Sequence, residues 1–164
     1  MGTYIRYIDR TREYYLAEGY NNPYKWAHFE DVPFTVLDKP LSECRITIVT
    51  SSEVKPRHDK SYEEENQLLV GNVYDIDSNL KASDLCTGQI LYDRYATNMD
   101  DIDSFFPVTR VHEVFAEGRV GSIAPFFHGL YTSYSQRKTR ETDALEVLKQ
   151  CRENGVDAAI LTPV

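Results

Sequence analysis

The sequence of 164 residues contains only three cysteines, Cys44, Cys86 and Cys151, which lie far apart. Their odd number and wide spacing exclude a disulfide framework, and the chain has no Cys-x-x-Cys pair for zinc or thiol redox chemistry. We therefore expect free thiols that are mostly buried, because free cysteine is among the most buried residue types. Cys151 lies on the apolar face of a predicted helix, which makes it a poor nucleophile.

Long apolar runs are also absent from the chain. No segment approaches the roughly 20 apolar residues that a membrane-spanning helix needs. The N-terminus lacks the apolar core of a signal peptide, and Arg6 stands where a myristoylation signal has Ser or Thr. These absences predict a cytoplasmic protein that makes no membrane contact.

Positive charge is scarce, since 18 Lys and Arg stand against 26 Asp and Glu, a formal net charge of −8. Nucleic-acid binding rests on basic patches, so this balance argues against it. We predict no metal site, because Asp100, Asp101 and Asp103 lack the glycine and distal glutamate of a calcium loop. One of these carboxylates is expected instead to accept free N–H groups of the next helix. The histidines have no metal-ligand spacing either: His28, His58, His112 and His128.

What the chain does contain is the pattern of an α/β domain. Apolar spacing predicts helices over residues 4–18, 107–118 and 139–153, the last with Ala144, Leu145, Val147, Leu148 and Cys151 facing inward. Gly19, Gly118 and Asn154-Gly155 are typical helix ends. Strands are predicted over residues 45–50, 68–73, 89–92 and 157–161, with a short strand or buried turn over 120–127. We predict a Rossmann-like or flavodoxin-like three-layer sandwich with a mostly parallel sheet, in which strands 45–50 and 157–161 are central.

The first 40 residues differ in character from the rest. After the N-terminal helix, Pro23, Pro33 and Pro40 stand among aromatic residues and exclude a long helix. We therefore predict an extended aromatic arm, with residues 1–40 forming the helix and arm and residues 41–164 forming the α/β domain. An exposed aromatic stretch also favours a protein–protein contact.

Three segments, taken in order, carry a resemblance. The first runs from Pro33-Phe34 through Lys39-Pro40-Leu41-Ser42-Glu43 into strand 45–50, the second from Tyr92-Asp93-Arg94 through 101–107 to 117–122, and the third over 154–164. Together they resemble the selenoprotein B family of the glycine, sarcosine, betaine and D-proline reductases, from about residue 24 to the end. Leu91 departs from the family pattern, because many relatives carry a histidine before the Tyr-Asp pair.

The resemblance implies reductive C–N cleavage of a small amino acid or N-methylated amine within a complex of subunits. It implies a nucleophilic cysteine or selenocysteine directly after the segment that matches Leu161-Thr162-Pro163-Val164, hence outside this chain. A Cys/Sec motif or a pyruvoyl group on a partner chain would then supply the chemistry, with no cofactor in this chain itself. Three explanations remain open: processing at Val164, loss of the motif, or a shortened sequence.

Open α/β sheets bind ligands beyond the carboxyl ends of their strands. Strand ends and segments matched to the family together predict six residues that line a pocket for a small polar substrate: Thr50, Ser51, Tyr92, Asp93, Asp103 and His128. The alternative is a non-catalytic interaction or ligand-binding subunit that has lost the redox motif, and whose aromatic arm docks a partner.

Overall fold

The computed structural model describes residues 6–22, 28–33, 35–57, 72–89, 92, 95, 97–131, 133 and 135–164. The chain divides into two compact units, Met1–Thr35 and Val36–Val164. In the first unit, helix α1 (Tyr7–Ala17) confirms the predicted N-terminal helix, and Gly19 follows it with a φ of 89°. Helix α1 buries none of its residues, and Tyr7 is 74% exposed.

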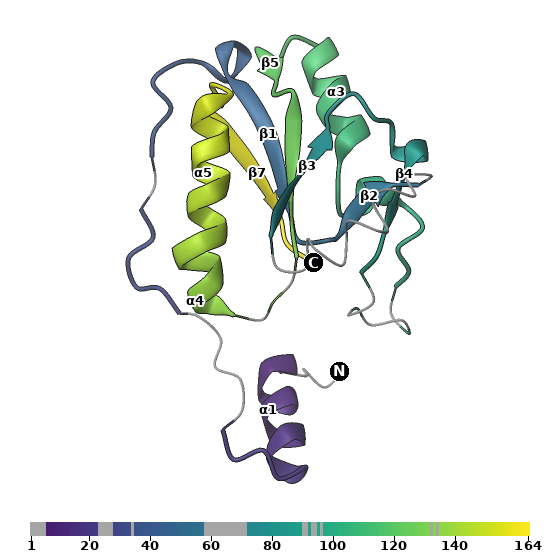
Figure 1. The fold of residues 1–164 in the computed structure, drawn as a ribbon, viewed down its shortest axis with the longest axis vertical. Helices are drawn as coiled ribbons and strands as arrows, with labels where there is room; N and C mark the ends of the chain where they lie inside the picture. Colours follow the sequence, from purple (N-terminus) through teal and green to yellow (C-terminus); the bar gives the residue numbers. More distant parts are fainter. Residues whose placement is uncertain are drawn as a thin grey trace, which may run out of the picture. The chain divides into compact units, whose positions relative to one another are not determined.

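The second unit is built on a mixed, mostly parallel sheet (Figure 1). Strand β1 (Arg45–Thr50) lies in its centre and pairs in parallel with β7 (Ala158–Thr162) on one side. The short β5 (Ser122–Ile123) and β6 (Phe126–Leu130) also run parallel to β1. Strand β3 (Val73–Asp77) completes the sheet by pairing antiparallel with β6. The predicted α/β class with a mostly parallel sheet is confirmed.

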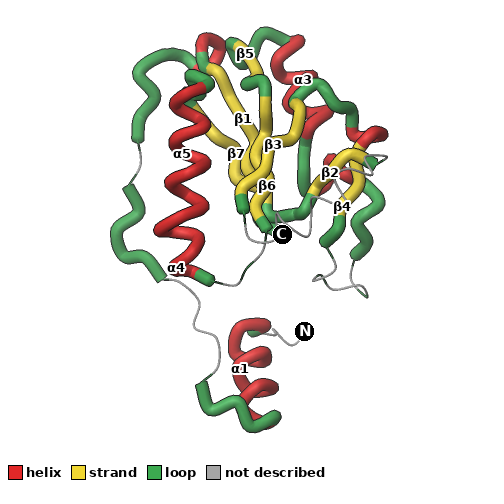
Figure 2. Tube along the Cα trace, in the orientation of Figure 1, coloured by secondary structure: helices red, strands yellow, loops and turns green. Residues whose placement is uncertain are grey.

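Helices cover the sheet and match their predicted positions (Figure 2). Helix α3 (Val108–Ala116) begins directly after Pro107, and Gly118 follows it with a φ of 71°. Helix α4 (Gln136–Lys138) runs through a π-helical turn (Thr139–Asp143) into α5 (Ala144–Glu153), and Gly155 ends this helix with a φ of 62°. Proline at a helix start and glycine after its end are the positions that their backbone preferences favour.

The core of the second unit lies between β1, β6 and α3. Ile46 and Ile48 of β1 belong to one buried apolar cluster with Val108 and Val111 of α3. Phe106 and Phe127 meet edge to face in the same cluster, with ring centroids 5.6 Å apart. Every residue of β1 after Arg45 is buried, so this strand holds the position of the loop that follows it.

A small antiparallel ribbon extends from the end of β1. Its strands are β2 (Val54–Pro56) and β4 (Leu85–Thr87). The Tyr74 hydroxyl donates to the Val54 carbonyl oxygen over 3.1 Å and ties the ribbon to the sheet. The Tyr74 ring lies over Gly129, where an added Cβ would come within 2.0 Å of it, so only glycine fits at this point of β6.

Two features of the sheet differ from the prediction. The C-terminal strand, predicted central and buried, is an edge strand of the described sheet: Ile160 is 39% and Leu161 71% exposed. An apolar run carries no information about which strands will flank it, so the sequence could not separate a central strand from an edge strand. The predicted inward face of α5 is only partly covered. Cys151 on this face is buried, whereas Leu145 is 59% exposed.

Two predicted strands fall largely outside the described residues. Of the predicted strand 68–73, residues 68–71 are not described, and β3 begins at Val73. Of the predicted strand 89–92, residues 90 and 91 are not described, whereas Gln89 and Tyr92 lie in no helix or strand. Strand β3 therefore shares only Val73 with the predicted strand and continues to Asp77.

Candidate functional site

The carboxyl ends of β1 and β7 are joined by side-chain hydroxyls. Thr50 Oγ1 donates to the Thr162 carbonyl oxygen over 3.0 Å and lies 2.6 Å from Ser52 Oγ. Ser51 Oγ accepts from the Val164 backbone nitrogen over 3.0 Å. Thr50 is 1% exposed, so its hydroxyl serves to hold the two strand ends together. Ser51 is partly exposed and stands at the edge where an open α/β sheet binds ligands.

A pocket of about 390 Å³ lies beside this strand end. It is tied to the loop after β1 by two side chains: Thr87 Oγ1 donates to the Ser52 carbonyl oxygen, and Gln89 Nε2 donates to that of Ser51 over 3.5 Å. Of the six predicted site residues, Tyr92 lines this pocket. The described lining residues are Arg57, Cys86, Thr87, Gln89, Tyr92, Met99, Asp100 and Ile102.

The exposed Arg57 side chain donates to backbone carbonyl groups at this pocket. Its Nε donates to the Ser83 oxygen over 3.3 Å, and its Nη2 donates to the Leu85 oxygen over 2.7 Å. Within the described parts of the chain, no carboxylate forms an ion pair with this guanidinium. A guanidinium that forms no ion pair with a described residue is suited to an anionic group such as a carboxylate.

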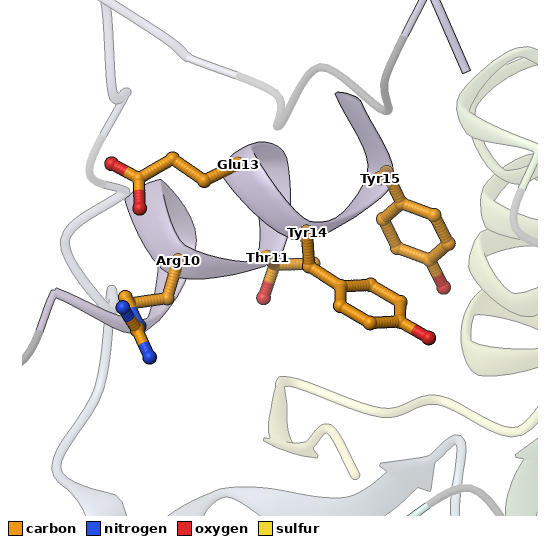
Figure 3. Close-up of a pocket in the computed structure, with 5 residues that line it drawn as sticks. All are labelled: Arg10, Thr11, Glu13, Tyr14 and Tyr15. Atoms are coloured by element: carbon orange, nitrogen blue, oxygen red, sulfur yellow. The ribbon is translucent and has the colours of Figure 1, made fainter. Parts of the chain in front are cut away.

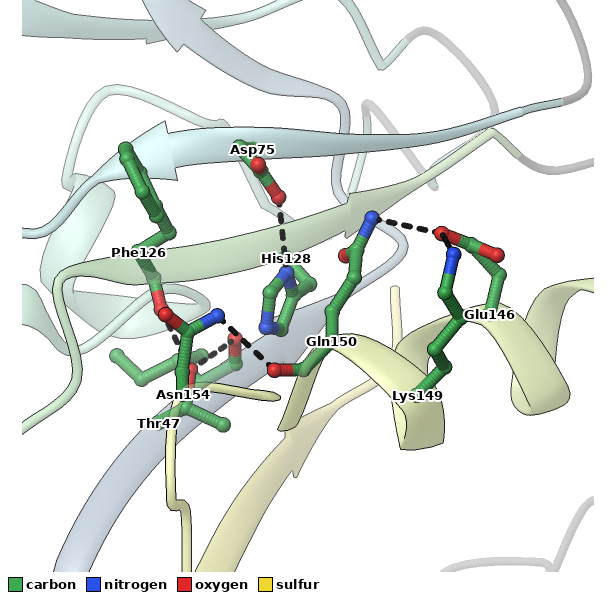
Figure 4. A network of polar contacts seen from close by, with 9 residues as sticks. Thr47, Asp75, Phe126, His128, Glu146, Lys149, Gln150 and Asn154 are labelled. Carbon is green, nitrogen blue, oxygen red and sulfur yellow. Dashed lines mark hydrogen bonds and ion pairs between the residues drawn. The ribbon is translucent and has the colours of Figure 1, made fainter. Parts of the chain in front are cut away.

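His128 is buried in the middle of the sheet, with 1% of its surface exposed. Its Nδ1 lies 3.1 Å from Asp75 Oδ1 on the neighbouring strand β3 (Figure 4). Its Nε2 is buried and has no hydrogen-bond partner among the described residues. His128 does not line the pocket beside β1, so the structure separates it from Tyr92.

Asp103 lies at the start of α3, where Oδ1 accepts from the Thr109 backbone nitrogen over 2.8 Å. Asp101 accepts in turn from the Asp103 backbone nitrogen over 3.1 Å. The expectation that this acidic cluster satisfies free N–H groups of the next helix is confirmed. Asp93, the remaining predicted site residue, lies outside the described residues, as does His58.

The three cysteines are free, as expected. Cys44 and Cys151 are buried, and burial raises the pKa of the Cys151 thiol, so neither is placed to act as a nucleophile. Cys86 is partly buried and lines the pocket. Sequence reasoning missed Arg57, Cys86 and Gln89 as pocket residues, because no motif marks them and only folding of the ribbon brings them to the strand end.

A second hollow, of about 540 Å³, lies along α1 (Figure 3). Its described lining residues, Arg10, Thr11, Glu13, Tyr14 and Tyr15, all belong to this one exposed helix, which alone cannot enclose a ligand.

In the described part of the chain, no group of three or more His, Cys, Asp or Glu side chains is arranged to hold a metal ion. None of the described helices is both long enough and apolar enough to span a membrane.

Comparison with known proteins decides the family. The family model described as glycine/sarcosine/betaine reductase selenoprotein B matches residues 11–164. The chain belongs to this family. The resemblance deduced from the three sequence segments is thereby confirmed, and the family match begins before residue 24, within helix α1.

Three curated relatives are similar to this member of the selenoprotein B family. The glycine reductase complex component B subunit gamma of Symbiobacterium thermophilum is 28% identical over 149 residues, covering 89% of this chain and 34% of the relative. The protein of the same name from Peptoclostridium acidaminophilum is 26% identical, with the same coverage. The D-proline reductase subunit gamma of Acetoanaerobium sticklandii is 27% identical over 132 residues, covering 79% of this chain and 52% of the relative.

The chain thus spans about a third to a half of the length of these relatives. No solved structure matches it.

Proposed function

We propose that this chain is a component of a reductase complex that cleaves a C–N bond in a small amino acid or N-methylated amine. Family membership and the similarity to subunits named for glycine reductase and D-proline reductase support this assignment. Within the complex, the chain would bind the substrate in the pocket beside the carboxyl end of β1. The proposed partners are the small substrate and other protein subunits, with the protein in the cytoplasm.

The observation that carries the proposal is the guanidinium of Arg57 in this pocket. Its Nε and Nη2 are held by backbone oxygens, which leaves Nη1 for a ligand. A substrate carboxylate would form the ion pair that no described carboxylate forms with this guanidinium. Gln89 and Tyr92 line the same pocket and add polar groups for orientation. A volume of about 390 Å³ suits a small molecule rather than a polymer.

The nucleophile of the reaction is proposed to lie on a partner chain, as a cysteine or selenocysteine motif or as a pyruvoyl group. Cys44 and Cys151 are buried, and burial raises the pKa of the Cys151 thiol, which supports this assignment because such a thiol forms little thiolate. The attack on the substrate would then come from the partner, while this chain binds and orients the substrate.

A ligand titration tests the proposal. The full chain is heated in the presence of glycine, sarcosine, betaine or D-proline, and a ligand that binds the folded state raises the melting temperature. Arg57→Gln should weaken binding about tenfold or more, because a hydrogen bond to a charged group contributes about 1.5–3 kcal/mol. Arg152→Gln, an exposed change on α5, is the matched control. If none of the four compounds stabilises the wild-type chain, the substrate-binding role is wrong.

A second candidate function is an interaction subunit that docks a partner through its N-terminal segment. The observation that favours it is the exposure of the apolar side chains of α1, which buries no residue: Tyr7 is 74%, Tyr14 61% and Leu16 46% exposed. Exposed aromatic residues are enriched at protein interfaces. The two candidates are compatible, because the helix and the pocket belong to different units of the chain.

A further inference from the structure

Strand β7 leaves one edge of the described sheet open. It pairs only with β1, so the backbone N–H and C=O groups on its other side have no strand partner among the described residues. Its residues, Ala158–Thr162, include no charge and no proline, which commonly protect an exposed edge. The edge strand β3, in contrast, carries the exposed carboxylates of Asp75 and Asp77. The β7 edge therefore has the chemistry to accept a strand from another polypeptide.

An apolar groove of about 430 Å³ lies beside this open edge. Its walls include Leu161 of β7 and Leu148 of α5, which are 71% and 44% exposed. The groove reaches the π-helical turn before α5, where Thr139 lines it. Apolar surface next to unpaired backbone groups is typical of a face that another chain covers.

The π-helical turn at this end of the groove is positively charged. Arg137 and Arg140 are both exposed, and neither forms an ion pair with a carboxylate in the described parts of the chain. Lys138 is paired with Asp143, and Glu141 is the exposed carboxylate of the turn. Two guanidinium groups thus face solvent beside the groove, in a chain whose net charge is −8.

The helix itself adds to this positive charge. The segment from α4 through the π-helical turn to α5 is one continuous helix, and the start of a helix carries a partial positive charge that favours acidic neighbours. Arginines at this position cost stability that an anionic partner would offset. The start of the helix lies toward the carboxyl end of β7 (Figure 1), so one end of a strand added to β7 would reach it.

We propose that β7 and the groove bind an extended segment of a partner subunit. Its apolar side chains fill the groove, and its acidic residues contact Arg137 and Arg140. Backbone hydrogen bonds along β7 supply affinity, and the two arginines select an acidic partner. The inference rests on the proposed function only in placing the chain in a complex, because this groove shares no described lining residue with the pocket of Arg57.

Two synthetic peptides test this surface on the full chain. They share a central run of alternating valine and threonine and carry either glutamates or lysines at both ends. The glutamate peptide should bind about fivefold or more tightly than the lysine peptide at low salt, because it faces two guanidinium groups. Amide hydrogen exchange should also slow at alternate residues of β7 when this peptide is bound, since an added strand pairs with the outward backbone groups.

Charge reversal at the turn provides the decisive variant. Arg137→Glu combined with Arg140→Glu should reverse the preference for the two peptides, and should not lower the melting temperature, because acidic residues suit a helix start. Arg110→Glu combined with Arg119→Glu is the matched control, since it changes the same charge at exposed arginines elsewhere. Leu161→Ser should weaken both peptides by a similar factor, because it removes an apolar wall of the groove.

Four results would overturn the inference. They are binding of neither peptide, binding without slower exchange in β7, an unchanged preference in the charge-reversed variant, and a wild-type chain that is dimeric with exchange in β7 already slow. The last would identify a second copy of this chain as the occupant. None of these results changes the titration with glycine, sarcosine, betaine or D-proline. Failure of that titration with intact peptide binding would reject the substrate pocket and leave the docking surface.

Discussion

Asp157 is the residue that joins the start of β7 to the start of β1. Its Oδ2 accepts from the Arg45 backbone nitrogen over 2.7 Å and lies 2.8 Å from Lys39 Nζ. The hydrogen bond from Lys39, followed by that from Arg45, lowers the pKa of Asp157, and the same contact with Asp157 raises the pKa of Lys39. This one carboxylate therefore couples three segments that are distant in the sequence.

We predict that Asp157→Asn destabilises the chain at neutral pH and that the difference from wild type disappears in acid. The folded-state pKa of Asp157 lies below its unfolded value, so its stabilisation is fully present above about pH 4 and is lost as the pH falls through the folded pKa. Urea unfolding at pH 7 and pH 3 measures the difference, with Glu153→Gln as a control for loss of an exposed carboxylate. A difference of equal size at both pH values would contradict the ionic origin.

At the scale of the element, β1 and β7 are neighbours in unequal surroundings. Ile48 and Ile160 are directly paired across these two parallel strands. Ile48 is fully buried because β1 has a strand on each side and side-chain layers on both faces, whereas Ile160 is 39% exposed on the edge strand. Two paired isoleucines thus differ in burial, because one lies on the central strand and the other on the edge strand.

We predict that Ile48→Ala costs about 2–5 kcal/mol of unfolding free energy, because a large cavity is left in the core. Ile160→Ala should cost about 1 kcal/mol or less, as expected for a partly exposed site. Chemical denaturation of the two variants gives the comparison directly. Equal losses would mean that β7 is covered in solution, for example by another polypeptide.

At the scale of the whole molecule, the two units have very different internal support. All residues of the buried apolar cluster lie between Ile46 and Phe127, with Ala158 among the side chains packed against it. Helix α1, in the other unit, buries no residue. The described residues of the first unit therefore contribute nothing to this cluster.

We predict that a chain lacking residues 1–35 keeps the melting temperature of the second unit to within about 2 °C, since none of the described core residues is removed. If the exposed α1 is a docking element, the shortened chain also loses association with its partner subunits, measured by co-purification with the reductase complex. A shortened chain that unfolds or aggregates at room temperature would contradict the independence of the second unit.

Much of the fold could be predicted from local sequence signals. Pro107, Gly118 and Gly155 mark helix ends through backbone preferences that act within a few residues, and the β-branched segment 45–50 marks the central strand. The position of β7 at the edge could not be predicted, because it depends on which other strands are present to flank it. The same limit applies to the site: Tyr92, a predicted site residue, lies at the pocket beside β1, whereas Arg57 and Gln89, which no local signal marks, reach this pocket through the ribbon.

The sequence by itself determined the α/β class, the family, the free thiols and the capping role of the acidic cluster, because each follows from residue type and local order. Tertiary structure alone decided that Thr50 is buried, that His128 pairs with Asp75 away from the pocket, and that Arg57 donates to backbone carbonyl groups of the ribbon. It also set the φ of Glu53, in the loop between β1 and β2, at 52°. These features depend on contacts between segments far apart in the chain, and hydrophobic and hydrogen-bonding patterns within a single segment do not specify them.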